Sequence, residues 1–92
     1  MTLNDYRTEI LFGEPVDNAC FMKASEASVG VNVYFENGRF KVYATDGQGN
    51  GDYLCSADTE PGVELLVNEA RRLFKQYGPG FSLFWNQHHS IW

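Results

Sequence analysis

The chain has 92 residues, 43% of them apolar, and its twelve acidic against seven basic side chains give a formal net charge of −5. This length allows one domain over residues 1–92, and the seven Phe, five Tyr and two Trp exclude a disordered chain, which lacks the apolar surface that offsets the entropy of ordering. The acidic balance excludes a general nucleic-acid binder, which needs a basic surface to displace counterions, so we expect no binding to free duplex DNA.

The N-terminal part of the sequence shows no targeting signal. The segment Met1–Arg7 lacks the basic start and apolar run of a signal peptide, and no stretch approaches the roughly 20 apolar residues that span a bilayer. We therefore expect a cytoplasmic protein without membrane contact. The first 27 residues leave the secondary structure open. Leu3–Phe12 fits a helix or a strand, and the next residues fit either a helix starting near Pro15 or a strand over Ala19–Ala24.

Asn37-Gly38 predicts a tight hairpin turn between two alternating runs, Val29–Glu36 and Arg39–Thr45. A type I′ turn needs positive φ at both central residues, which Asn and Gly tolerate. The two-residue turn sets the register, with Glu36 opposite Arg39 and Val31 opposite Ala44. One face of this hairpin is then apolar and is expected in the core: Val29, Val31, Val33, Phe35, Phe40, Val42 and Ala44. The other face is polar and rich in Tyr and cations: Asn32, Tyr34, Glu36, Arg39, Lys41 and Tyr43.

A helix is predicted over Pro61–Tyr77, because its apolar residues recur at intervals of three and four. Asp58 or Thr59 can cap it, and Gly78-Pro79 ends it. Short strands are expected at Tyr53–Ser56 and Phe81–Trp85. The predicted fold class is α+β, with an antiparallel sheet of about four strands and one or two helices packed on one face.

The stretch Asp46–Asp52 resembles a calcium loop at first sight. An EF-hand needs a bidentate Glu at position twelve, which is Ala57 here, and the glycines do not match the spacing of a phosphate-binding loop. We expect a flexible hairpin loop without a metal.

The cysteines and histidines show no pattern that indicates catalysis. Cys20 and Cys55 form no CxxC pair, and we expect both to be reduced core residues. His88-His89 lies in a tail between two tryptophans, and adjacent histidines converge poorly on one metal. A small hydrolase or metal enzyme that uses these histidines with a Cys is the third-ranked hypothesis. We predict no catalytic residue, no metal and no cofactor.

The candidate contacts with a partner come from the sheet, the acidic loop and the end of the helix. Tyr and Arg are enriched at interface hot spots, although a second layer of the protein could equally cover the sheet residues. The cations of the helix complement its dipole, or they contact phosphate or an acidic surface. The candidate partner-binding residues are Tyr34, Arg39, Lys41, Tyr43, Asp46, Asp52, Arg71, Arg72 and Lys75.

From MTLNDYRTEILFGEPVDNACFMKAS through VGVNVYFENGRFKVYATDGQGNGDYLC to NQHHSIW, the chain resembles small phage-encoded anti-CRISPR proteins. The similarity is closest to inhibitors of the type I-F surveillance (Csy) complex. It implies stoichiometric binding to Cas subunits of this crRNA-guided complex, in the cytoplasm of the infected bacterium, which blocks hybridisation of target DNA. The family has no shared signature and implies no role for any one residue.

A mixed interface suits such a partner. Dispersed acids would pair with cations that normally hold nucleic acid, while Arg71, Arg72 and Lys75 would touch guide-RNA phosphates. The alternative is another small acidic phage binding module, an adaptor or an immunity-type inhibitor, whose partner has no nucleic acid.

Overall fold

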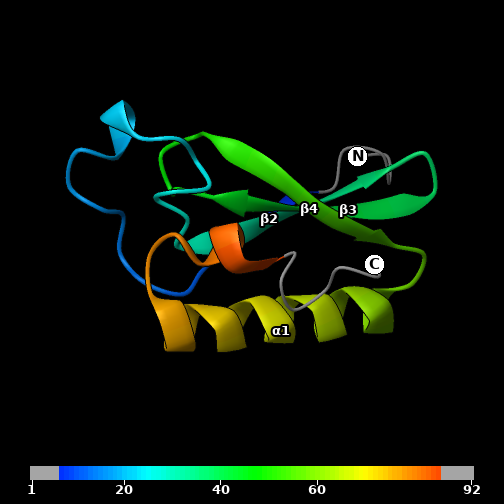
Figure 1. Ribbon diagram of the computed structural model, residues 1–92. Coiled ribbons are helices and arrows are strands. Elements are labelled where there is room, and N and C mark those ends of the chain that lie inside the picture. The colour runs from blue at the N-terminus through cyan, green and yellow to red at the C-terminus, as the bar shows by residue number, and fades with distance from the viewer. Residues whose placement is uncertain (1–6, 86–92) are drawn as a thin grey trace.

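The structure is a computed structural model that describes residues 7–85, and these residues form a four-stranded antiparallel sheet with one α-helix on one face (Figure 1). The sheet order is β1-β2-β3-β4, so each strand pairs with its neighbour in the chain. The strands are β1 (Arg7–Leu11), β2 (Gly30–Glu36), β3 (Arg39–Thr45) and β4 (Gly51–Ala57). The helices are α1 (Glu60–Tyr77) and two short 3-10 helices, η2 (Ala19–Phe21) and η3 (Phe81–Phe84). The predicted α+β class is confirmed.

The central hairpin has the predicted turn and register. Asn37 has φ 53° and Gly38 has φ 78°, as a type I′ turn requires. Glu36 lies opposite Arg39, and the pairing continues without a shift to Gly30 opposite Thr45. The turn therefore places the apolar residues of β2 and β3 on one face of the sheet, which we call the inner face.

Helix α1 begins one residue earlier than predicted and ends at the predicted residue. Thr59 caps it, because its Oγ1 accepts a hydrogen bond from the Gly62 N–H at 3.1 Å. Asp58, the other candidate cap, instead forms an ion pair with Arg39 at 2.9 Å. Gly78 stops the helix with φ 73°, and its N–H donates to the Phe74 carbonyl at 2.7 Å. Among residues 7–85, no helix is both long and apolar enough to cross a bilayer.

The predicted strand at Phe81–Trp85 is wrong, since this segment begins as the 3-10 helix η3. A strand would place Phe81, Leu83 and Trp85 on one face. Instead Phe81 and Trp85 are buried while Leu83 is 55% exposed, which fits a helical turn. Both aromatic side chains complete the core, so packing overrides the strand preference of the sequence.

In the described part of the N-terminal segment, the structure decides between the helix and the strand that the sequence left open. Of the segment Leu3–Phe12, residues 3–6 lie outside the described residues, and the rest contains the strand β1, whose Thr8 and Ile10 lie opposite Val33 and Val31. After it, the helix from Pro15 and the strand over Ala19–Ala24 are both replaced by η2. Ala19 is the buried residue of η2, while Cys20 and Phe21 beside it are exposed, so the segment offers no continuous apolar face for a longer helix or strand.

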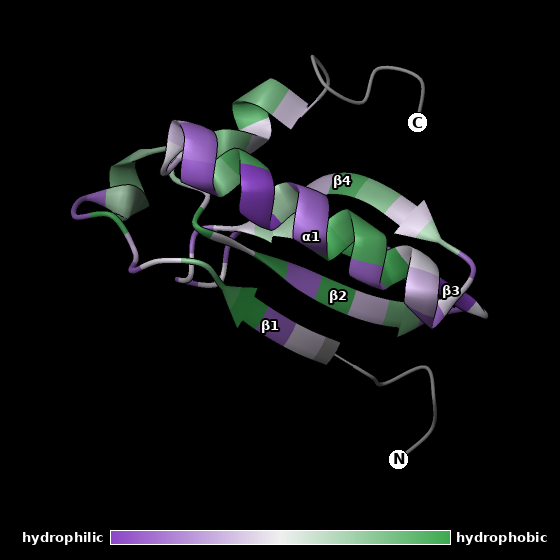
Figure 2. Cartoon of the chain, turned by 90° about the horizontal axis from the view of Figure 1, so that it is seen from below, coloured by the Kyte–Doolittle hydropathy of each residue, from purple (hydrophilic) through white to green (hydrophobic). Residues whose placement is uncertain are grey.

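The core lies between α1 and the inner face of the sheet. Figure 2, viewed from the helix side, shows α1 lying over the sheet while β1 remains uncovered at the edge. Phe81 and Trp85 close one end of this layer. Both cysteines are free thiols, as predicted. Cys55 is buried, as expected. The core position expected for Cys20 is wrong, because Cys20 is exposed. The principal core residues are Val31, Val33, Val42, Ala44, Cys55, Leu66, Val67, Ala70, Leu73, Phe81 and Trp85.

Two adjacent leucines of α1 test this orientation. Leu66 is 1% exposed and Leu65 is 67% exposed. We expect Leu66→Ala to lower the free energy of unfolding by about 3 kcal/mol, because it removes transfer energy and leaves a cavity, whereas Leu65→Ala should cost less than about 0.5 kcal/mol. Urea denaturation followed by circular dichroism measures both. Equal losses in the two variants would contradict the orientation.

Candidate protein-interaction surface

The sheet presents its second face, which we call the outer face, away from α1. Both α1 and η3 pack on the inner side, and η2 lies beyond the end of the sheet where β3 passes into β4 (Figure 1). Strand β1 pairs edge to edge with β2, so it widens the sheet and does not cover it. Within residues 7–85, no helix or strand forms a second layer over this face. Its side chains on β2, β3 and β4 include Asn32, Tyr34, Glu36, Arg39, Lys41, Tyr43 and Tyr53.

Three tyrosines cross the outer face from β2 to β4, and we call them the tyrosine row. The rings of Tyr34 and Tyr43 meet edge to face with centroids 5.4 Å apart, and those of Tyr43 and Tyr53 meet in the same way at 5.4 Å. Tyr34 and Tyr43 are half-buried, and Tyr53 is 53% exposed. The row therefore offers a broad contact surface that is already held in place by its own ring contacts.

Tyr53 was not among the sequence candidates, because a β-bulge decides which way it points. In β4, Cys55 lies opposite Val42 and Tyr53 lies opposite Tyr43, so Leu54 is an extra residue between two consecutive pairs. In a regular strand Tyr53 and Cys55 would share a face. The bulge instead turns Tyr53 outward while Cys55 stays in the core, and no local sequence pattern revealed this shift.

The two predicted cations of the outer face already contact acids of the same chain. Arg39 pairs with Asp58 at 2.9 Å and donates to Ser56 at 3.2 Å, while Lys41 lies 3.5 Å from Glu36. Both ion pairs are substantially exposed, so each contributes little to stability. Such weak pairs can be exchanged for contacts with a partner at small cost.

Asn32 lies beneath this surface and has an unsatisfied polar atom. The residue is only 4% exposed, and its Oδ1 has no hydrogen-bond partner among the described residues. It lines a shallow pocket of about 300 Å³ together with Tyr34, Glu36, Tyr43, Gly49 and Gly51. A buried acceptor without a partner costs about 1–3 kcal/mol, so this position is unfavourable for the free protein.

Asp46 organises the loop between β3 and β4 and is not available to a partner. The residue is completely buried. Its carboxylate accepts hydrogen bonds from the N–H groups of Gln48 at 2.8 Å and Asn50 at 3.2 Å, and from Asn50 Nδ2 at 2.9 Å. Burial opposes ionisation of this carboxyl, but the hydrogen bonds outweigh burial and lower the pKa of Asp46 below its ordinary value. Asp46 is therefore not part of the candidate surface. The loop, which we expected to be flexible, is held together by the hydrogen bonds of this carboxylate.

The remaining acidic candidate, Asp52, does not join the tyrosine row. It is exposed, but it lies opposite Ala44, whose side chain faces the core. Directly paired residues of antiparallel strands share a face, so Asp52 belongs to the inner side of the sheet. There it borders the segment around Cys20 and Lys23.

The three cationic candidates of α1 lie on the side of the molecule opposite the tyrosine row. Arg71 packs over the Phe12 ring at 5.3 Å and donates to Asn68 Oδ1 at 2.9 Å. Arg72 pairs with Glu69 at 2.8 Å, and Lys75 is exposed in the last turn. One flat interface cannot contain both these cations and the tyrosine row.

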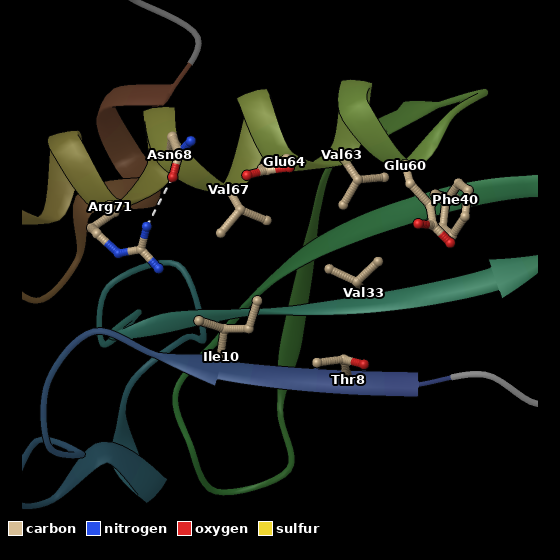
Figure 3. A pocket seen from close by; sticks show the side chains of 10 residues that line it. All are labelled: Thr8, Ile10, Val33, Phe40, Glu60, Val63, Glu64, Val67, Asn68 and Arg71. Carbon is tan, nitrogen blue, oxygen red and sulfur yellow. Dashed lines mark hydrogen bonds between the residues drawn. The ribbon is translucent and has the colours of Figure 1, made fainter.

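Arg71 also borders a second pocket, of about 400 Å³, between β1 and α1 (Figure 3). Ile10 and Val33 project into it from the sheet, and Val67 faces them from the helix. Polar side chains of α1 edge it, including Glu64 and Arg71. The pocket exists because α1 lies over the centre of the sheet and leaves the inner side of β1 partly open.

The described residues hold no arrangement that indicates catalysis. Burial raises the pKa of the Cys55 thiol to about 12, so it does not form a reactive thiolate near neutral pH. No group of three potential metal ligands is found within residues 7–85. His88 and His89 lie outside the described residues.

Comparisons with protein-family models, with curated proteins and with solved structures found no match to this chain.

The role of Asp46 gives a pH-dependent prediction. The lowered pKa means that the charged carboxylate stabilises the fold above the unfolded pKa near 3.8, and that this contribution declines as the pH falls through the folded pKa. At pH 7, Asp46→Asn should lower the free energy of unfolding by about 1–3 kcal/mol, because charge-assisted hydrogen bonds are lost. The difference from the unmodified protein should shrink in acid.

Urea denaturation between pH 3 and 7 measures this difference. Asp52→Asn is the matched control, because this carboxylate is exposed, and it should change stability by less than about 0.5 kcal/mol. A constant effect of Asp46→Asn over the whole pH range would rule out the proposed role of the charge.

Proposed function

We propose that this chain is a non-catalytic binding protein that docks on a partner protein through the outer face of its sheet. The observation that carries the proposal is the tyrosine row, which crosses a face that no described helix or strand covers. Tyrosine gives a large contact area with a polar tip and loses little conformational freedom on binding. A row held by its own ring contacts reduces this loss further, which favours affinity.

The charges of the outer face support a mixed interface. Arg39, Lys41 and Glu36 surround the tyrosine row in weak, exposed ion pairs. The whole chain carries a net charge of −5, which steers it toward a positively charged surface. Charge thus guides the encounter, and the aromatic surface supplies most of the contact.

The proposed partner is the one that a resemblance to anti-CRISPR proteins implies. We propose that the chain binds Cas subunits of the type I-F surveillance complex stoichiometrically and blocks hybridisation of target DNA. The basic channels of such a complex normally hold nucleic acid, and an acidic protein with an aromatic docking face is suited to occupy them. The host cytoplasm is the compartment in which this partner is present.

The position of the helix cations changes the proposed role of guide RNA. Because Arg71, Arg72 and Lys75 face away from the tyrosine row, contact with guide-RNA phosphates would need a second surface. We therefore propose that the outer face binds protein and that these cations are dispensable for the main interaction.

We expect Tyr53→Ala to weaken binding to the purified type I-F complex at least tenfold, in keeping with the loss of an interface aromatic. The half-exposed ring contributes little to folding, so stability should change only slightly. Lys75→Ala is the matched control on the opposite side and should bind like the unmodified protein. Biolayer interferometry with the immobilised complex gives both dissociation constants.

Two results would contradict the proposal in different ways. Loss of binding in Lys75→Ala with full binding in Tyr53→Ala would assign the contact to the helix side. No association of the unmodified protein at low micromolar concentration would exclude this partner. Competition with target DNA then separates the two partner classes, because an adaptor or immunity-type module would bind a protein partner that target DNA does not displace.

A further inference from the structure

We infer that the pocket around Asn32 is a socket for an arginine side chain of the partner protein. This inference deepens the proposed function, since it rests on the outer face being the docking surface. It names the chemical group that the surface recognises at its centre, a guanidinium ion.

The lining of the pocket has the chemistry of a cation site. Its carboxylate comes from Glu36, its aromatic walls from Tyr34 and Tyr43, and its unpaired acceptor from Asn32. Among the described side chains, none that lines it belongs to Lys or Arg. A cation that enters the pocket therefore meets a negative charge and two ring systems, both of which attract it.

The unpaired Oδ1 of Asn32 is the observation that points to a ligand. Asn32 is more than nine-tenths buried between two strands, at a position where an apolar side chain would avoid the cost of an unsatisfied acceptor. A hydrogen-bond donor supplied by a partner protein would remove this free-energy cost. In the complex, the same atom would then become a source of affinity and specificity.

A guanidinium group fits these features better than other donors. It is planar, stays charged, carries several N–H donors in a fixed arrangement and stacks on aromatic rings. It has donors for either of the two acceptors in the lining, Asn32 or Glu36, and a planar face that can lie against a tyrosine ring. The present partner of Glu36, Lys41, is 3.5 Å away in an exposed pair, so exchange for an incoming arginine costs little.

Two glycines keep the pocket open. Gly49 has φ 95°, and a Cβ placed there would meet no atom within 4 Å. At Gly51, a Cβ would lie 3.7 Å from the Cβ of Tyr43 and would extend over the pocket. Gly51 has no positive φ, so a side chain at this position can block the socket without backbone strain.

The test uses the isolated full chain and two small probes, N-acetyl-arginine amide and its neutral isostere N-acetyl-citrulline amide. Each is titrated to about 50 mM at 150 mM salt, because a ligand this small binds at best in the millimolar range. Nuclear magnetic resonance follows the side-chain amide of Asn32 and the backbone amides of Tyr34 and Gly51. We expect saturable shifts at these three positions with the arginine probe and at least tenfold weaker binding of the citrulline probe.

Three variants test whether the arginine probe binds in the pocket around Asn32. Asn32→Leu removes the unpaired oxygen and should lose at least tenfold in arginine affinity while its melting temperature stays equal or rises. Gly51→Val should block the probe with Asn32 intact. Asp52→Asn removes one negative charge on the other side of the sheet, should leave arginine binding unchanged and so controls for general attraction of cations.

The results separate the socket from the proposed partner. Three results would overturn the socket, even if the type I-F complex binds the chain. They are the absence of chemical-shift changes, equal changes with both probes, and changes that persist in both Asn32→Leu and Gly51→Val. Arginine binding at Asn32 without any binding of that complex would leave the socket standing and exclude the proposed partner.

Discussion

One-sided burial of the β2–β3 hairpin is the constraint on which the rest of the structure depends. The two-residue turn at Asn37-Gly38 fixes the register, and the register collects the valines of both strands on the inner face. Helix α1 can bury its own apolar side only against that face, where Leu66 and Leu73 become inaccessible. Because the helix supplies a single covering layer, the second face of the sheet is left to polar and aromatic side chains.

Strand β2 contains both residues that stabilise the core and one that does not. Val31 and Val33 of β2 are buried and apolar, whereas Asn32 between them is buried with an oxygen that has no hydrogen-bond partner within residues 7–85. The first two residues stabilise the fold, whereas a buried acceptor that lacks a hydrogen bond lowers stability. Local departures of this kind are expected where a surface is selected for binding and not for stability alone. The socket proposed above gives this unfavourable residue a role.

The loop between β3 and β4 links the fold to the proposed interface. Asp46 is buried and its carboxylate holds the N–H groups of Gln48 and Asn50, which fixes the path of the chain into β4. That path places Gly49 and Gly51 at the edge of the Asn32 pocket. Asp46, which the sequence suggested as a contact residue, thus acts indirectly, because it positions the two glycines that line the pocket.

The amino-acid sequence by itself determined the central hairpin, its register and α1, because each rests on local interactions: positive φ at Asn37-Gly38, strict alternation, and a capped helical period. It also placed Tyr34 and Tyr43 on one face. Only the tertiary structure decided the rest. The bulge at Leu54 turned Tyr53 outward, and the core drew Phe81 and Trp85 into a helical turn. The tertiary structure also buried Asp46 and placed the cations of α1 on the side of the molecule opposite the tyrosine row. These outcomes depend on contacts between residues distant in the chain, which no local pattern encodes.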